Sequence, residues 1–299
     1  MDKVIQKNLK KIRQKEEKLL QKTGDGFLQT ITSKVEDKIP EGLYEKLQQA
    51  FYLGFKTVFE KGNIVIEKTY DREELAIHHR VFDQTFDLID KKKSLKGLNK
   101  LAGQSNLRNL GITAVEGSGL GLLGIGLPDI PVFIGVVLKS VYEIALSYGY
   151  DYREQDEQYF ILKLLEAALA SDEEKDEKNR QMDKLIDFYT QQVAIGYDLD
   201  LQMRQTADCF AADMLCIKFL QGLPLVGVIG GPANVTYCKK ISDYARLKYQ
   251  KRYLLQKEEQ QKRQEREKLA KVEREIEAKL QQSEPQTDAQ KDTNKELAP

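Results

Sequence analysis

The stretch GSGLGLLGIGLPDIPVFIG, residues 117–135, constrains the fold of this chain more than any other feature of its sequence. Five of its first ten residues are glycine, two prolines follow, and one acid, Asp129, stands in a largely apolar run. Glycine lets backbones approach closely, and proline interrupts a continuous helix. The stretch therefore predicts a glycine-packed helical hairpin, and two other interpretations are a nucleotide-binding loop and a membrane segment. We assign to the hairpin Gly117, Gly119, Gly121, Gly124, Gly126, Pro128 and Pro131.

The nucleotide interpretation rests on a literal G-x-G-x-x-G match at residues 119–124. This motif binds a dinucleotide only where a strand precedes it and a helix N-terminus follows it. Pro128 and Pro131 interrupt the helix that would have to follow, and the surrounding sequence lacks the alternation of strand and helix. We therefore expect no nucleotide and no other cofactor.

The membrane interpretation rests on residues 119–138, which are long enough to cross a bilayer core. Asp129 at the centre would cost about 2.5–3.5 kcal/mol on insertion scales, so a peripheral or re-entrant contact is favoured over a span. A lysine cluster lies upstream in KKKSLKGLNK, residues 91–100, which we interpret as a basic linker. A buried hairpin preceded by a solvated linker is the alternative. The lysines predicted to contact lipid are Lys91, Lys92, Lys93, Lys96 and Lys100.

The charge of the chain is balanced overall but uneven along its length. Of the 299 residues, 31% are charged and 41% are hydrophobic, and the net charge is zero, so no global field favours a nucleic acid partner. Residues 1–22 carry eight basic against three acidic side chains, residues 151–200 six against fourteen, and residues 246–280 twelve against seven. Such segments can steer a charged partner, although solvated helix faces have the same composition.

Cysteine and histidine give no sign of a disulfide framework or a metal site. Three cysteines are an odd number for a chain of this size, which favours a reducing compartment, and the N-terminus lacks the apolar core of a signal peptide. We therefore expect a cytoplasmic protein. His78 and His79 are neighbours whose side chains diverge on a helix, and Cys209 and Cys216 have no partner motif, so we predict no metal.

Hydrophobic spacing of three and four residues predicts a mostly α fold. The best strand signal is GNIVIEK at 62–68, and no regular strand pattern surrounds it. We expect a multi-helix globular domain with glycine- and proline-rich apolar hairpins at its core and a long charged C-terminal helix. Helices are expected over residues 3–22, 64–90, 131–148, 153–170 and 180–221, and two helical runs separated by Pro40 and Gly42 are expected within 27–60. A last, long helix is expected to start within 222–235 and to continue to about residue 282.

Four segments organise the chain. We expect a charged N-terminal helix at 1–26, a helical domain at 27–255, a charged helical extension at 256–282 and a disordered tail at 283–299. The two glycine-proline patches, at 117–135 and 222–235, have similar composition, so we expect them to pack together.

No nucleophile–base pair, phosphate loop or zinc motif is present, so an enzyme would need an unfamiliar constellation of side chains. Its only candidates in an apolar setting are Glu116, Asp129 and Glu143. Burial would raise the pKa values of such carboxyl groups, as a general acid requires. A hydrolase using Asp129 and Glu143 is therefore the alternative to a non-enzymatic protein.

Two sequence blocks resemble the EcsC family of bacterial proteins. The first joins G-L-G-x-x-G-x-x-L-P-D-I-P at 119–131 to Y-E-I-A-x-x-Y-G-Y-D at 142–151, and the second begins LPLVGVIGGPANV at 223–235. The similarity covers about residues 40–255, and Asp129 and Asp151 match acids of the family pattern. The family takes its name from a protein encoded beside the subunits of an ABC transporter. The family has no established biochemical activity, so the resemblance implies no catalytic residues.

We therefore expect a non-enzymatic accessory protein that associates peripherally with the cytoplasmic membrane or with a membrane transporter. Its expected partner is an anionic membrane surface or that transporter, and no nucleic acid.

Overall fold

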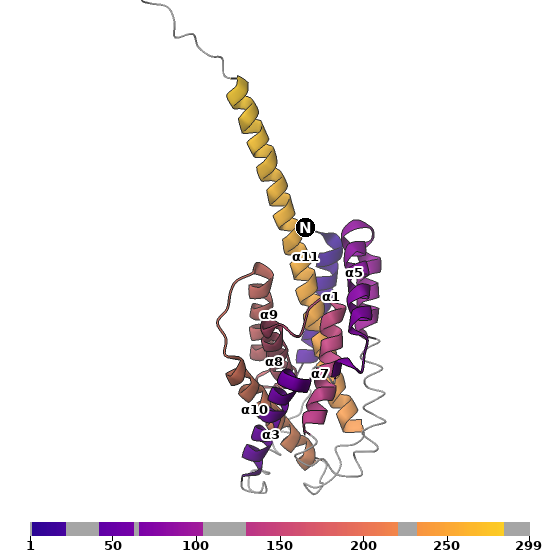
Figure 1. Cartoon of the computed structure of the whole chain (residues 1–299), viewed down its shortest axis with the longest axis vertical. Helices are drawn as coiled ribbons and strands as arrows, with labels where there is room; N and C mark the ends of the chain where they lie inside the picture. The colour runs from indigo at the N-terminus through magenta and orange to yellow at the C-terminus, as the bar shows by residue number, and fades with distance from the viewer. Residues whose placement is uncertain (1, 22–41, 63–65, 104–129, 221–231, 284–299) are drawn as a thin grey trace, which may run out of the picture. The chain divides into compact units, whose positions relative to one another are not determined.

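The computed structural model of the chain describes residues 2–21, 42–62, 66–103, 130–220 and 232–283 (Figure 1). These residues are mostly helical and contain no strand, so the predicted α fold is confirmed. The glycine-rich hairpin at 117–129, the acids Glu116 and Asp129, the second glycine-proline patch before residue 232 and the tail after 283 lie outside the described residues. The predicted packing of the two patches therefore stays a prediction.

The helices follow one another along the chain. They are α1 (Lys3–Leu20), α3 (Leu43–Thr57) continued by the π-helical turn η2 (Val58–Gly62), α5 (Arg72–Leu88), α7 (Ile130–Ser147), α8 (Gln155–Leu169), α9 (Lys175–Gln191), α10 (Leu199–Leu220) and α11 (Pro232–Ser283). Residues 91–103 are also helical. The chain divides into two compact units, Met1–Gln256 and Lys257–Pro299, and α11 contributes residues to both.

The second unit consists of the charged end of α11. Its side chains pair along the helix: Arg263 Nε lies 3.3 Å and Arg266 Nη2 lies 3.0 Å from Oε1 of Glu259. A pair of opposite charges four residues apart, as Glu259 and Arg263 are, stabilises a solvated helix by about 0.2–0.5 kcal/mol. Leu269, Val272 and Ile276 are exposed here, so this stretch buries little apolar surface of its own.

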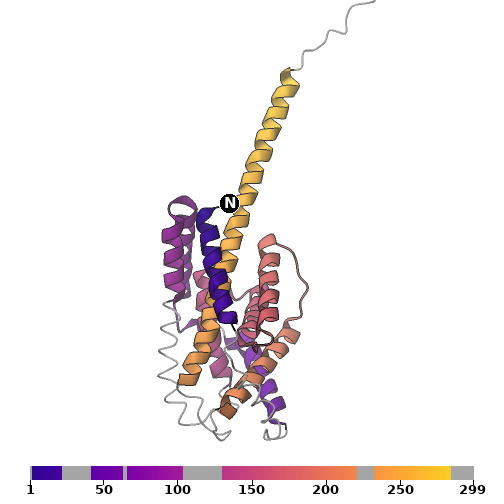
Figure 2. The ribbon, with the colours of Figure 1, turned by 180° about the vertical axis from the view of Figure 1, so that it is seen from behind.

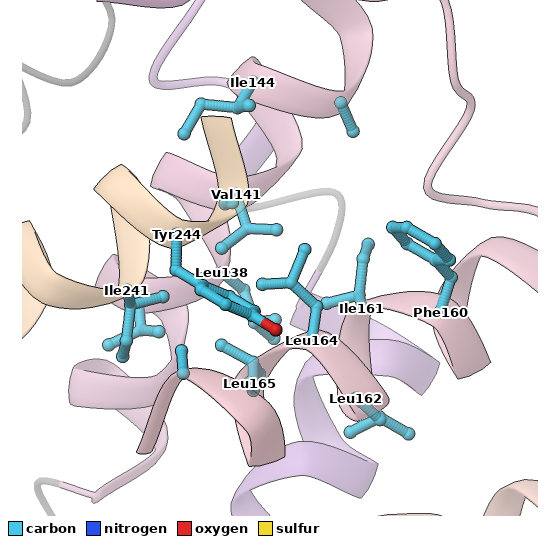
Figure 3. Close-up of a cluster of buried hydrophobic side chains, with 14 of the residues drawn as sticks. Leu138, Val141, Ile144, Phe160, Ile161, Leu162, Leu164, Leu165, Ile241 and Tyr244 are labelled. Carbon is cyan, nitrogen blue, oxygen red and sulfur yellow. The ribbon is translucent and has the colours of Figure 1, made fainter. Parts of the chain in front are cut away.

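The core of the first unit is built around α7. Twelve of its 18 residues are buried, on all sides of the helix, as expected for a helix enclosed by others. It packs against α3 and α5, while α10 packs against α3 and α8, and α9 packs on α8. Figure 3 shows where α7, α8 and α11 meet, with Leu138, Val141 and Ile144 facing Ile161, Leu164, Leu165, Ile241 and Tyr244.

Among the described helices, α7 is the one that is long and apolar enough to cross a membrane. Its 18 residues have a mean hydropathy of 1.7, and 67% of the helix is buried inside the unit. The core helix of a helical bundle has the same length and composition. The burial accounts for the apolar sequence of α7, and this property by itself assigns no span.

A left-handed glycine ends α7. Gly149 has φ +87°, and Tyr150 N–H donates to the carbonyl of Ala145 at 3.0 Å, which closes the helix end. A Cβ at this position would lie 2.2 Å from Nε2 of His79 on α5. Both the backbone conformation and the close approach of α5 therefore require glycine.

The interpretation of residues 91–100 as a linker is wrong, because residues 91–103 form a helix. Asp90 caps it: Oδ1 accepts the backbone N–H of Lys92 at 2.8 Å and of Lys93 at 3.0 Å. The buried side chains Leu95 and Leu98 follow at helical spacing. Gly97 faces α5, where a Cβ would lie 2.2 Å from the Phe82 ring, so this glycine serves close helix packing and is no sign of a linker.

The expectation of one helix over 180–221 is also wrong. Gln192 adopts the left-handed conformation with φ +59° and ends α9, and an irregular segment follows at 193–198. The next helix starts at Leu199, where Asp198 Oδ1 accepts the N–H of Leu201 at 3.0 Å. Glutamine is not a preferred residue at a helix end, so the stop at Gln192 leaves no signal in the sequence, whereas aspartate is a preferred N-cap.

Replacing Gly149 with alanine should destabilise the protein, because a Cβ would meet the His79 ring and disfavour φ +87°. We expect Gly149→Ala to lower the free energy of unfolding by about 2 kcal/mol, measured by urea denaturation. Gly196→Ala is the control, because a Cβ there would contact nothing within 4 Å. Equal effects of the two substitutions would contradict the role given to Gly149.

Candidate functional site

The helix at residues 91–103 separates an apolar face from a cationic face. Leu95, Leu98 and Ala102 are buried against the rest of the unit. Lys92, Lys96 and Lys100 recur every fourth residue and are exposed, and Lys93 is exposed beside them. The helix therefore presents four lysines together on a solvent-facing strip, which we call the lysine ridge (Lys92, Lys93, Lys96 and Lys100), and no acid lies within residues 91–103.

Lys91 differs from the other predicted lysines because its charge is already paired. Its ammonium group contacts the carboxylate of Asp2 and lies 5.7 Å from the centre of the Phe86 ring. Asp2 also accepts the N–H groups of Val4 and Ile5 at 2.8 and 3.2 Å and so caps α1. Burial favours the neutral form of Asp2, but these hydrogen bonds outweigh it and keep the pKa of its carboxyl below the usual value. Lys91 thus joins two helices.

Two exposed aliphatic side chains stand beside the lysine ridge. Leu88 ends α5 and Ile89 follows it, and each side chain is 81% exposed. Ile77 and Val81, further back on α5, are about half exposed. An isolated exposed aliphatic residue is ordinary, but here two adjacent ones occupy the turn that leads directly into a cationic helix. We call Leu88 and Ile89 the aliphatic tip.

Helix α1 extends the cationic surface. In Figure 2 it lies beside the helix pair formed by α5 and residues 91–103, as the contact of Asp2 with Lys91 requires. Residues 3–15 contain six basic side chains and no acid, while Ile5 and Ile12 are buried beneath them. The exposed basic side chains are Lys3, Lys7, Lys10, Lys11, Arg13 and Lys15.

A buried group of charges holds the other end of α1. The Lys248 side chain on α11 is fully buried, and its Nζ lies 2.6 Å from both Glu16 Oε1 and Asp183 Oδ1. Lys251 Nζ lies 3.2 Å from Glu16 Oε2 and 2.8 Å from Asp183 Oδ1. Two cations and two carboxylates therefore compensate each other where α1, α9 and α11 meet.

Glu143, the described member of the proposed carboxylate pair, lies in a packed region of tyrosines. Its side chain is 5% exposed, and its charge contributes to the raised pKa of Tyr70, which burial raises most. Next to it in the sequence, Tyr142 stacks on Tyr152 with ring centres 3.9 Å apart. Tyr70 donates to Tyr152 Oη at 2.7 Å, and Tyr152 donates to Glu67 at 2.7 Å. The surroundings of Glu143 are thus protein side chains, and its approach to Asp129 stays a prediction.

The Y-G-Y-D segment at 148–151 connects this region to three helices. Tyr148 donates to Asn99 Oδ1 at 2.7 Å and so contacts the helix that carries the lysine ridge. Asp151 accepts from Arg72 Nη2 at 2.5 Å at the start of α5. Tyr150 lies over the guanidinium of Arg252 on α11, at 4.0 Å from its ring centre. The segment therefore organises packing around the candidate surface.

His79, Cys209 and Cys238 occupy packing positions, whereas His78 is exposed. His79 Nδ1 lies 3.3 Å from the carbonyl of Ser147, and its ring meets Tyr253 edge to face. Burial raises the pKa of the Cys209 and Cys238 thiols to about 12, which makes the reactive thiolate rare at neutral pH. Across the described residues, no group of three His, Cys, Asp or Glu side chains could hold a metal ion.

The sequence pointed to the lysines but not to the aliphatic tip. Leu88 and Ile89 continue the hydrophobic spacing of α5, so they resemble core residues in a periodicity pattern. Their exposure depends on the turn at Asp90, where the chain reverses before the next helix. Asp90, a preferred N-cap residue, is the local signal for that reversal in the sequence.

Comparison with known proteins gives a family and distant relatives. The model of the EcsC protein family matches residues 5–254 and so includes α1, which the motif resemblance had left outside. Protein EcsC of Bacillus subtilis (strain 168) is 24% identical over 232 residues, which cover 76% of this chain and 86% of that protein. Uncharacterized protein YdbA of the same strain is 25% identical over 185 residues, 59% of this chain and 65% of that protein. No solved structure matches.

Removing the buried ammonium group at position 248 should loosen α1. Lys248→Met leaves Glu16 and Asp183 with Lys251 as their remaining cation, and we expect a loss of about 3 kcal/mol in unfolding free energy. Hydrogen exchange of the α1 amides should accelerate in the same variant. Lys184→Met on the exposed side of α9 is the control. If both variants exchange α1 amides at the wild-type rate, the charge group does not hold α1.

Proposed function

The chain belongs to the EcsC protein family, and from this premise we propose that it acts as a non-enzymatic accessory protein on the cytoplasmic face of an anionic membrane. The observation that carries the proposal is the lysine ridge beside the aliphatic tip. The binding is peripheral: the lysines face lipid headgroups, and Leu88 and Ile89 enter the boundary between headgroups and acyl chains.

Charge complementarity supports anionic lipid as the partner. A basic residue near an anionic membrane contributes about 1 kcal/mol, so the four lysines of the ridge contribute about 4 kcal/mol together. The basic face of α1 adds a second set of exposed cations beside them. Neither helix segment, 3–15 or 91–103, contains an acid that would offset this attraction.

The aliphatic tip supports a lipid surface over other polyanions. Lipid offers an apolar layer directly beneath its charged headgroups, whereas a nucleic acid backbone does not. Partial burial of two aliphatic side chains adds about 1–2 kcal/mol each. With the lysines, the total is comparable to a single myristoyl chain, which binds membranes reversibly with an association constant on the order of 10⁴ M⁻¹.

Membrane association also fits the second expectation, contact with a membrane transporter. That expectation comes from the protein after which the family is named, which is encoded beside transporter subunits. In this proposal, binding to the lipid surface brings the chain close to such a transporter. The hydrolase alternative, with Asp129 and Glu143 as its carboxylates, is a second hypothesis. The burial of Glu143 among tyrosines favours a packing role for it, and Asp129 lies outside the described residues.

Vesicle flotation tests the proposal. We expect the full chain to float with phosphatidylglycerol-containing vesicles at low salt and to stay unbound with pure phosphatidylcholine.

Changing Lys92, Lys93, Lys96 and Lys100 to Gln should remove most binding. Leu88→Ser with Ile89→Ser should weaken it while leaving its salt dependence, because only the apolar contribution is lost. Binding should fall in 1 M salt, where the screening length shrinks to about 3 Å from about 10 Å at 0.1 M.

The matched control removes the same charge elsewhere. Changing Lys184, Lys268, Lys271 and Lys279 to Gln alters four exposed lysines outside the ridge and should leave binding unchanged. If this control loses binding as much as the ridge variant does, general charge explains the effect and the ridge is not the site. A wild-type chain that stays unbound at low salt overturns the proposal, and one that stays bound in alkaline carbonate overturns its peripheral character.

A further inference from the structure

A cavity of about 400 Å³ lies on the first unit, away from the lysine ridge. It forms where the first turn of α8, the end of α9 with the irregular segment after it, and α11 come together. Its volume is within the usual range for small-molecule sites, about 300–1,000 Å³. The residues that line it are Asp156, Tyr189, Gln192, Val193, Ala194, Ile195 and Arg252.

Arg252 provides a rigid cationic group in this cavity. Its side chain is 11% exposed, and the rings of Tyr150, Phe160 and Tyr189 surround the guanidinium with centres 4.0, 4.4 and 4.8 Å away. These contacts fix the plane of the guanidinium.

Part of this guanidinium is available to a ligand. Nη1 donates to Glu157 Oε2 at 2.7 Å, and Glu157 Oε1 accepts the hydroxyl of Tyr249 at 2.6 Å. Among the described residues, Nε and Nη2 of Arg252 make no hydrogen bond, and neither is a buried atom without a partner. Arg252 lines the cavity, so these N–H groups can meet an anionic group there.

Asp156 provides an anionic group on the cavity wall. Its side chain is exposed, and only Oδ1 carries a hydrogen bond among the described residues, from the hydroxyl of Tyr197 at 2.6 Å. The Tyr189 hydroxyl donates to its backbone carbonyl at 3.0 Å and holds the residue beside the cavity. Val193, Ala194 and Ile195 form an apolar wall.

The charges decide the class of ligand. Glu157 already compensates Arg252, so Asp156 leaves the site with a net negative charge, and a simple anion would be repelled. A simple cation would leave Nε and Nη2 of Arg252 without an acceptor in the described part of the chain. A zwitterion satisfies both groups, with its carboxylate at Arg252 and its ammonium at Asp156. We propose that this cavity binds a free α-amino acid with an apolar side chain, which packs on the wall at residues 193–195. The inference is independent of membrane binding.

Charge-blocked ligands test the site without altering the protein. In calorimetric titrations of the full chain, we expect L-leucine or L-phenylalanine to bind. N-acetyl-L-leucine lacks the ammonium and L-leucinamide lacks the carboxylate, so each should bind at least about tenfold more weakly, equivalent to about 1.4 kcal/mol. Equal binding of the blocked and free forms overturns the zwitterion assignment. If no apolar amino acid binds at concentrations up to about 10 mM, the site assignment fails, since that limit excludes even very weak binding.

Two substitutions at exposed positions test the location. Asp156→Asn removes the charge and can keep the bond from Tyr197. It should weaken L-leucine about tenfold and also weaken L-leucinol, which keeps the ammonium and lacks the carboxylate, while hardly changing the weak binding of N-acetyl-L-leucine, which has no ammonium for Asp156 to meet. Ala194→Trp should fill the cavity and abolish binding of every ligand. Asp176→Asn, an exposed acid in the first turn of α9, is the matched control and should bind normally. Unchanged L-leucine binding in Ala194→Trp, with an unchanged melting temperature, overturns the location.

Discussion

The end of α7 is the constraint on which the rest of the first unit depends. Gly149 takes a left-handed conformation beneath the His79 ring, and the chain leaves the helix with its next side chains directed toward different neighbours. Tyr148 contacts the helix that carries the lysine ridge, Asp151 pairs with the start of α5, and Tyr150 packs on Arg252. One turn therefore sets the positions of both candidate sites relative to the core, although neither site includes it.

The apolar residues of the described chain are divided between the core and a small part of the surface. α7 has the composition of a membrane helix, but most of its apolar side chains are buried in the core. An attraction to a membrane would therefore have to come from other residues. In the membrane association that we propose, the lysine ridge and the aliphatic tip would supply this attraction through charge and a shallow apolar contact. This combination predicts a reversible, salt-dependent association, because electrostatic attraction is screened and two aliphatic side chains are a weak anchor.

Helix periodicity predicted most of the fold, although the helix expected over 64–90 starts at Arg72, and two further failures have identifiable causes. The apolar side chains that residues 91–103 bury are Leu95, Leu98 and Ala102, which stand among lysines, and Gly97 resembles a breaker although it makes room for Phe82. The break after α9 falls at Gln192, a residue with no strong preference for ending helices. Of the candidate sites, the lysines were visible in the sequence. The cavity was not visible in the sequence, because Asp156, Ala194 and Arg252 come together only where α8, α11 and the irregular segment after α9 pack.

The buried charges at Lys248 explain why α1 belongs with the core although its sequence is mostly polar. Two apolar side chains, Ile5 and Ile12, are too few to specify how such a helix docks. Glu16 reaches a fully buried ammonium group, and any shift of α1 along α11 would leave Asp183, among the described residues, as the one carboxylate near Lys248 and Lys251, so one buried positive charge would be uncompensated. The energetic gain of such a group is small compared with the cost of misplacing it, so its effect is to select one position. That position places Asp2 against Lys91, at the start of the helix that carries the lysine ridge. The family model matches from residue 5 onward, so most of α1 belongs to the part of the chain that the family model covers.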